Sequence, residues 1–250
     1  MSTSNGKHAQ KPKTNKTHKV PIFRIISLII IVICGIYIGK WMVENKHTDE
    51  IVKIAQSAVV EREDNTISVD FAKLKETNSD VVAWLKVNNT SIDYPIVQGQ
   101  DNSYYLTHSF DKTYNAAGWP FLDYRVNLNG TDQNMTIYGH NRRDGSMFCT
   151  LKDILKPEWY ENEENLYISY ITEQEEQRYQ VFSIYQIEKE TYYTTNSFES
   201  EKAFEEFLIE IKGRSKVDFN VDVNSSDKIL TLSTCADNNN YRVVLHAKKI

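Results

Sequence analysis

The sequence predicts a mainly β domain with inserted helices, preceded by an apolar segment near its start. From residue 81 onward, short runs of β-branched and aromatic residues alternate with turn residues, which is typical of a closed barrel or a sandwich. The 250 residues are 40% hydrophobic and 12% aromatic, enough to bury one good core. We therefore expect one globular domain with N-terminal appendages.

The first two appendages are a basic tail, residues 1–19, and a transmembrane helix, residues 20–43. The tail holds five lysines and no acidic residue. Residues 25–39 are uncharged and lie between Arg24 and Lys40, whose snorkelling side chains extend the span towards the ~20 residues that a bilayer requires. By the positive-inside rule, we predict a single-pass protein of the cell membrane with a cytoplasmic N-terminus and an extracellular domain.

Two other interpretations of the apolar segment are a cleaved signal peptide and a buried core helix. A signal peptide should end in a small-x-small site, and only the isolated Gly39 stands near the end of this segment. A core helix would show a polar face, and residues 25–38 show almost none. Both observations favour a membrane anchor that is retained.

Residues 44–78 are charged, with apolar residues at helical spacing. We expect one helix that leaves the membrane and a shorter one that packs on the domain, although a spacer with a solvated face explains the pattern equally well. The domain itself should occupy residues 79–250. Its expected strands are residues 82–87, 92–97, 136–138, 166–171, 179–187, 228–235 and 241–248.

Two helices are expected between these strands. Residues 146–155 contain one short helical pattern. Residues 199–212 form a longer one, with Ser197 or Ser200 available as the N-cap. Its apolar face consists of Ala203, Phe204, Phe207, Leu208 and Ile211.

Charge distribution excludes one class of partner. The first 43 residues contain seven of the 29 Lys and Arg and none of the 34 Asp and Glu, which leaves 22 basic and 34 acidic residues, a net charge of −12, in the rest. A domain of this charge has no basis for general nucleic-acid binding and is repelled by phosphate-rich wall polymers.

Cysteine usage leaves two candidates in the exported part. Cys34 lies inside the apolar segment, so only Cys149 and Cys235 remain, too few for a disulfide scaffold. A bridge between these two stays open as an alternative. A nucleophilic role for Cys235 requires its thiol to be free.

The last twenty residues read as two strands joined by a turn, which places Cys235 at a strand end and Arg242 at the start of the partner strand. His140 also follows a strand-like run. A thiol has a reference pKa near 8.5, so the thiolate needs a nearby cation. We predict Cys235 as the nucleophile, His140 as the acid and base, and Arg242 with backbone N–H groups after Cys235 as oxyanion donors.

Each of these residues has a structural alternative. A solitary cysteine is more often a small buried hydrophobe, and an arginine is usually a surface ion-pair partner. His140 could be a capping or surface histidine. His108 and His246 are competing bases, and His246 shares a strand face with Arg242.

Four separated motifs, in the same order, resemble those of class B sortases. They are Thr231-Leu-Ser-Thr-Cys235 with Arg242, the histidine segment Ile137-Tyr-Gly-His140-Asn-Arg, the segment Asp80-Val-Val-Ala-Trp-Leu with Ile92-Asp-Tyr-Pro, and Asp101-Asn-Ser-Tyr-Tyr-Leu106. The similarity runs from about Asp70 to the C-terminus. It implies a closed eight-stranded barrel, an N-terminal helical pair, and a long helix between strands six and seven. It also implies that His140, Cys235 and Arg242 share one groove.

The resemblance further implies a cysteine transpeptidase that cuts a C-terminal sorting signal after Thr through a thioester and passes the protein to an amine of the cell-wall precursor or of a pilin. The expected substrate-binding residues are Asn102, Leu106, Thr191, Tyr193 and Ser233. No cofactor is implied, and the sequence lacks HxxxH, HxxEH and CxxC metal patterns.

Two alternative functions stay open. One is a wall-peptide cysteine hydrolase that uses water, although papain-like hydrolases place Cys before His, whereas here His140 precedes Cys235. The other is a non-catalytic, membrane-tethered module that holds the sorting peptide without cutting it.

Overall fold

The computed structural model describes residues 22–61, 67–142, 144–235 and 240–250, with Glu61 and Cys235 described by their backbone alone. The chain divides into two compact units, Met1–Val43 and Glu44–Ile250. Helix α1, Ile22–Gln56, begins in the first unit and ends in the second. Among the described helices, it is the one long and apolar enough to cross a membrane. The expected basic tail lies outside the described residues.

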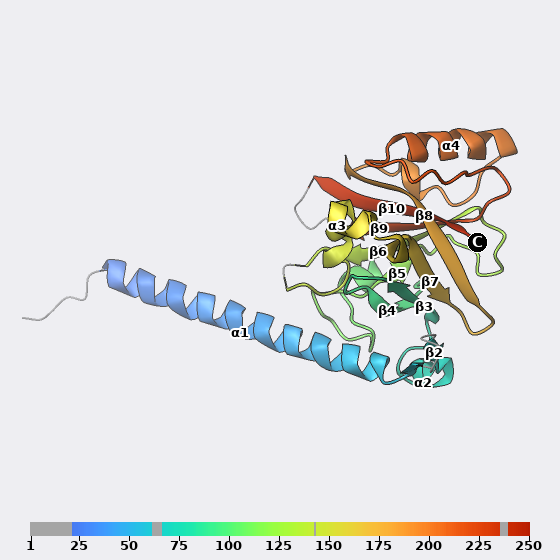
Figure 1. Ribbon diagram of the computed structural model, residues 1–250. Helices are drawn as coiled ribbons and strands as arrows, with labels where there is room; N and C mark the ends of the chain where they lie inside the picture. The colour runs from blue at the N-terminus through green and yellow to red at the C-terminus, as the bar shows by residue number, and fades with distance from the viewer. Residues whose placement is uncertain (1–21, 62–66, 143, 236–239) are drawn as a thin grey trace, which may run out of the picture. The chain divides into compact units, whose positions relative to one another are not determined.

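The second unit is built on a closed barrel of eight strands. Figure 1 labels these strands. The order around the barrel is β10-β8-β7-β3-β4-β5-β6-β9. The strands are β3 Val81–Val87, β4 Asp93–Val97, β5 Phe121–Leu122, β6 Asn134–His140, β7 Tyr167–Ile171, β8 Glu176–Glu188, β9 Ile229–Cys235 and β10 Tyr241–Lys249. The predicted closed, eight-stranded barrel is confirmed.

Two pairs in the barrel are parallel, β4 with β5 and β6 with β9; the others are antiparallel. Parallel strands end at the same edge of a sheet, so β6 and β9 present their last residues together. The barrel is filled by fully buried apolar side chains such as Trp84, Ile137 and Leu232. Burial of this interior fixes the register, because a one-residue slip would turn each strand inside out.

The segment before the barrel contains two helical parts and a hairpin between them. The last turns of α1 bury Thr48, Ile51 and Ala55. Strands β1, Val59–Glu61, and β2, Ile67–Val69, form the hairpin, which the sequence did not predict. Helix α2, Phe71–Thr77, follows, and Asp70 caps it by accepting a hydrogen bond from Lys73 N at 3.0 Å.

Helix α4, Glu201–Gly213, lies between β8 and β9, the sixth and seventh strands of the barrel, as predicted. Ser200 caps it by accepting from Ala203 N at 3.1 Å. Its buried face packs on the outer side of the sheet in a second apolar cluster that includes Phe182 and Val244. Figure 1 shows α4 along one side of the barrel, near β8 and β10.

The remaining helices are short. The segment expected as a helix over residues 146–155 forms a 3₁₀ helix, η2, Cys149–Leu155. The others are η1 Tyr104–Leu106, α3 Pro157–Tyr160, η3 Glu163–Leu166 and η4 Tyr192–Thr194. Of these, η1 and η4 flank the groove described next.

Candidate active site

The register of β6 and β9 joins the two residues predicted to react. In this parallel pair, seven successive residues are partners, and the last partners are His140 and Cys235. Neighbouring strands lie about 4.8 Å apart. Residues separated by 95 positions in the sequence therefore occupy adjacent backbone positions at one end of the barrel.

Arg242 approaches the same end from β10. The antiparallel register of β9 and β10 pairs Ser233 with Val244. If this register is continued by two residues, Arg242 on β10 lies opposite Cys235 on β9. Arg242 is partly exposed, and its Nη1 donates to the carbonyl oxygen of Tyr241 at 3.3 Å.

The His140 ring is buried, with 6% of the residue exposed. Its Nε2 lies 2.7 Å from the carbonyl oxygen of Leu106, the last residue of η1. A carbonyl oxygen only accepts, so Nε2 is the donor in this contact and carries the proton.

Gly118 permits this packing of His140 against η1. It has φ +60°, and a Cβ there would lie 2.5 Å from Tyr105 O and 2.8 Å from His140 Cδ2. Such distances are too short for a real Cβ, and the left-handed conformation also favours glycine. The backbone therefore closes against the ring as only glycine allows.

His140 and Arg242 line a groove of about 870 Å³. Four of the five residues predicted to bind substrate also line it, namely Asn102, Leu106, Thr191 and Tyr193. The fifth, Ser233, is not among the lining residues. It is 1% exposed, and its hydroxyl lies 3.0 Å from the hydroxyl of Tyr193, so the structure places it behind the groove wall.

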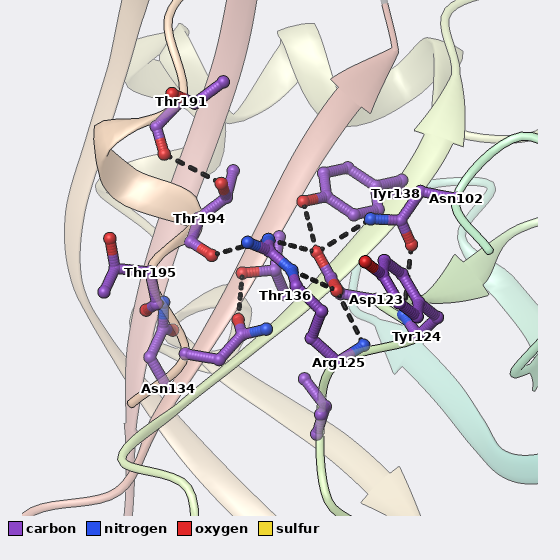
Figure 2. Close-up of polar contacts among 12 residues, drawn as sticks. Asn102, Asp123, Tyr124, Arg125, Asn134, Thr136, Tyr138, Thr191, Thr194 and Thr195 are labelled. Carbon is purple, nitrogen blue, oxygen red and sulfur yellow. Dashed lines mark hydrogen bonds and ion pairs between the residues drawn. The ribbon is translucent and has the colours of Figure 1, made fainter. Parts of the chain in front are cut away.

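A hydrogen-bond network around the buried Asp123 supports the groove, and the sequence did not reveal it. Asp123 follows β5 and accepts hydrogen bonds from Arg125 Nε at 2.9 Å, Arg125 Nη2 at 2.7 Å, Tyr138 Oη at 2.9 Å and Asn102 Nδ2 at 3.0 Å. Figure 2 shows these side chains converging on its carboxylate. Arg125, Tyr138 and Asn102 all line the groove.

The network fixes the ionisation of its members. Burial of Asp123 acts to raise its pKa, but the hydrogen bonds from Arg125 and Tyr138 outweigh burial and hold the pKa below its ordinary value. Burial, followed by the charge of Asp123, raises the pKa of Tyr138. At neutral pH, Asp123 is thus a carboxylate and Tyr138 an intact hydroxyl donor.

The groove wall formed by η4 is held by side chains from the opposite side. Asn134 Nδ2 donates to Tyr193 O at 3.2 Å and to Thr195 O at 2.9 Å. Arg125 Nη2 donates to Thr194 O at 3.1 Å. Three successive carbonyl groups at the end of η4 are therefore fixed by Arg125, which lies between β5 and β6, and by Asn134, the first residue of β6.

Comparison with known proteins decides the family. The sortase domain model matches residues 85–250. The sortase B of Listeria monocytogenes is 34% identical over 236 residues, covering 90% of this chain and 94% of the relative. The chain belongs to the class B sortases.

Solved class B sortases share the fold. A Staphylococcus aureus sortase B in complex with substrate has a TM-score of 0.68 and 35% identity, covering 72% of this chain and 84% of that one. A sortase B complexed with triglycine has a TM-score of 0.71 and 31% identity, covering 83% and 97%. Sortases are cysteine transpeptidases, and this class B sortase is an enzyme of that kind.

The competing histidines of this sortase lie elsewhere. His246 is fully buried between Tyr185 Oη and Thr231 Oγ1, each at 2.8 Å. Burial and the charge of Arg214 lower its pKa to about 3, so the ring is neutral and enclosed. His108 stacks on Tyr104 with ring centroids 4.0 Å apart, and it is not among the groove-lining residues.

Cys149 and the described residues of metal-ligand types give no second site. Cys149 is free and buried at the start of η2, and it does not line the groove. Within the described ranges, no group of three or more His, Cys, Asp or Glu side chains could hold a metal ion.

Proposed function

We propose that this sortase cleaves a C-terminal sorting signal after Thr and transfers the protein to a cell-surface amine, with Cys235, His140 and Arg242 as its catalytic residues. The observation that carries the proposal is the pairing of His140 with Cys235 at the ends of two adjacent parallel strands. Nucleophilic catalysis by cysteine requires a base at such a short separation.

In the first step, the Cys235 thiolate attacks the carbonyl carbon of Thr, and negative charge develops on the carbonyl oxygen. Arg242 supplies a planar pair of donors to this oxyanion. The C–N bond then breaks, and protonated His140 gives its proton to the departing amine. The products of this step are a thioester on Cys235 and the released C-terminal peptide.

In the second step, an incoming amine attacks the thioester carbon and loses a proton to His140. The C–S bond breaks, and the thiolate is restored with a new amide in place of the old one. The sortase B complexed with triglycine supports an acceptor with a free amine, because a glycine tripeptide carries one at its N-terminus. A wall-precursor peptide or a pilin offers the same group.

The proposal includes a membrane anchor. The apolar part of α1 would hold the enzyme in the membrane, with residues 1–19 in the cytoplasm and the barrel outside. Proteins that carry a sorting signal would then meet the groove at the surface where their acceptor amines are found.

Peptide turnover by the full-length chain in detergent tests the function. A library of fluorogenic pentapeptides containing Thr should yield cleavage, and added hydroxylamine should divert the acyl product to a hydroxamate. Cys235→Ala should abolish both products, whereas the matched variant Cys149→Ser should retain turnover within about threefold, since Cys149 does not line the groove. Cleavage with water alone as acceptor would indicate a hydrolase, and binding without cleavage a peptide-holding module.

A further inference from the structure

Arg125 occupies an unusual place in the groove. Its side chain is 47% exposed, while its partner Asp123 is fully buried. Nε and Nη2 bind the two oxygens of that carboxylate, and Nη2 also reaches Thr194 O on the opposite wall. One guanidinium therefore connects the segment after β5 with η4, as Figure 2 shows.

The guanidinium has donors left over. An arginine carries five N–H bonds in a fixed plane. The contacts to Asp123 and Thr194 use the Nε hydrogen and both Nη2 hydrogens. Within the part of the chain that the structure describes, Nη1 makes no hydrogen bond. Because Arg125 lines the groove and is half-exposed, these two N–H groups are available to a bound peptide.

The net charge of the Arg125–Asp123 pair indicates which kind of oxygen the two Nη1 N–H groups would bind. Asp123 is ionised, so the Arg125–Asp123 pair is neutral as a unit. A neutral donor pair gives little advantage to a carboxylate over an uncharged acceptor. Its fixed plane instead suits the oxygen of a peptide carbonyl or a side-chain carboxamide.

We infer that Arg125 is a substrate-binding residue whose Nη1 donates to a carbonyl or carboxamide oxygen of the sorting peptide, while Asp123 acts through it as a positioning residue. The inference rests on the proposed function, since the peptide is the substrate of that reaction. The inference means that the Asp123 network contributes one polar contact to the bound peptide, through Arg125. The same contact would tie peptide binding to the position of η4.

Variants of Arg125 test this contact through steady-state kinetics on the library peptide that the wild-type chain cleaves fastest. Arg125→Lys keeps a positive charge beside Asp123 but removes the second nitrogen of the fork. A hydrogen bond from a donor whose charge is compensated is worth about 3- to 10-fold in binding, so we expect kcat/KM to fall by that factor, mostly through KM. Alkylation of the catalytic thiol by iodoacetamide should proceed at the wild-type rate.

Arg178→Lys is the matched control, because Arg178 lies 4.0 Å over the Tyr167 ring and does not line the groove. It should leave kcat/KM within about twofold of wild type. Arg125→Ala should lower kcat/KM at least as much as Arg125→Lys. Should the alanine variant unfold because Asp123 is left unpaired, the lysine variant decides. A KM for Arg125→Lys within twofold of wild type would overturn the inference.

Peptides in which one amide is replaced by an ester distinguish two roles of Arg125. One is direct contact with the peptide, and the other is support of the groove wall formed by η4. An ester carbonyl is a weaker acceptor than an amide carbonyl. At the position that Arg125 contacts, the ester peptide should therefore have a higher KM than the amide peptide with the wild-type enzyme. With Arg125→Lys, the two peptides should have the same KM. Fully additive effects at every position would also overturn the inference. If the wild-type chain cleaves no peptide, the proposed function fails before Arg125 is tested.

Discussion

Single residues in the groove differ in how their side chains are held and in whether their charge is paired. His140 is held by a hydrogen bond from Nε2 to Leu106 O, which fixes the orientation of the ring. Arg242 lies across β9 and differs from Arg125 in that no carboxylate among the described residues forms an ion pair with it. In the proposed reaction, the charge of Arg242 would serve the developing oxyanion, whereas the charge of Arg125 is neutralised by Asp123.

The first prediction separates charge from geometry at Arg242. If Arg242 only favoured the thiolate, Arg242→Lys would work nearly as well, because an ammonium carries the same charge. If it holds the oxyanion with a planar fork, lysine loses the second donor and its aim. We expect kcat/KM for peptide to fall by about 100- to 1000-fold while the thiol alkylates at near the wild-type rate. Intact peptide turnover would contradict the oxyanion role, and slowed alkylation would show that Arg242 acts on the thiol pKa.

The second prediction concerns His246, whose folded-state pKa of about 3 lies below its ordinary value of 6.5. Above pH 6.5, both states are uncharged and the stability is fully present. As the pH falls from 6.5 towards 3, the unfolded chain takes up a proton that the folded chain does not. The free energy of unfolding should therefore fall by up to about 1.4 kcal/mol per pH unit from this residue.

His246→Gln removes that titration and serves as the comparison. Denaturant unfolding at pH 7 and pH 5 should show a smaller loss of stability in the variant than in wild type. Turnover per folded molecule should change little at pH 7, because His246 does not line the groove. Removing the ring should still lower stability, since Tyr185 and Thr231 each lose a buried partner. An equal pH slope in the two proteins would contradict the assignment.

At the scale of secondary structure, the ends of strands, rather than long helices, position the residues of the site. β6 and β9 finish together because they are parallel, and β10 returns beside β9. On the other side, η1 and the turn at Gly118 close against the His140 ring. The site is thus formed where three strand ends meet two short loop helices.

The third prediction tests this closure with two glycines that share a positive φ. Gly118→Ala and Gly130→Ala both strain the backbone, at φ +60° and +76°. Only at Gly118 would the new Cβ meet Tyr105 O, Leu106 O and His140, whereas nothing lies within 4 Å at Gly130. We expect Gly118→Ala to lower kcat by at least tenfold and to destabilise by about 1–3 kcal/mol more than Gly130→Ala. Equal activity of the two variants would show that the loop relaxes without moving His140.

Strong local patterns explain why much of this arrangement was predictable. The β-branched runs, the Ser200 cap and the apolar face of α4 are local signals, and the four motifs implied the barrel as a whole. Strand β5 has only two residues, Phe121–Leu122, too few to show periodicity. The β1–β2 hairpin is likewise made of three-residue strands.

The Asp123 network was not predictable for a different reason. In the sequence, Asp123-Tyr-Arg125 resembles an ordinary turn with a local ion pair. Its importance comes from Asn102, Tyr138 and Thr194, which only the fold brings together. Ser233 shows the converse, because the resemblance to class B sortases implied a groove residue, while its burial behind Tyr193 is decided by the packing of η4.

At the scale of the whole molecule, residues 44–250 carry a net charge of −12, and the described chain holds one helix long and apolar enough to cross a membrane. The end of α1 is bonded to the catalytic unit, since Asn115 Nδ2 donates to Glu44 O at 3.2 Å and to Thr48 Oγ1 at 3.0 Å. In the proposed topology, the membrane helix, rather than charge, holds the enzyme at the cell surface.

The fourth prediction concerns topology. Five lysines and Arg24 precede the apolar segment, and by the positive-inside rule the N-terminus stays in the cytoplasm. Protease added to intact protoplasts should digest the barrel while sparing an epitope tag on residues 1–19. Lysed protoplasts provide the control in which both are digested. Protection of the barrel in intact protoplasts would contradict this orientation.

The most direct test of the account is the intact mass of the full-length chain during turnover of a cleaved Thr-containing peptide. We predict an added mass equal to the peptide fragment that ends in Thr, located on Cys235 by fragmentation and removed by hydroxylamine as a thioester should be. His140→Ala should fail to build this adduct from a peptide, because the departing amine then lacks its acid. An adduct on another residue, or cleavage that persists in Cys235→Ala, would contradict the claim that the β6–β9 register assembles the catalytic pair.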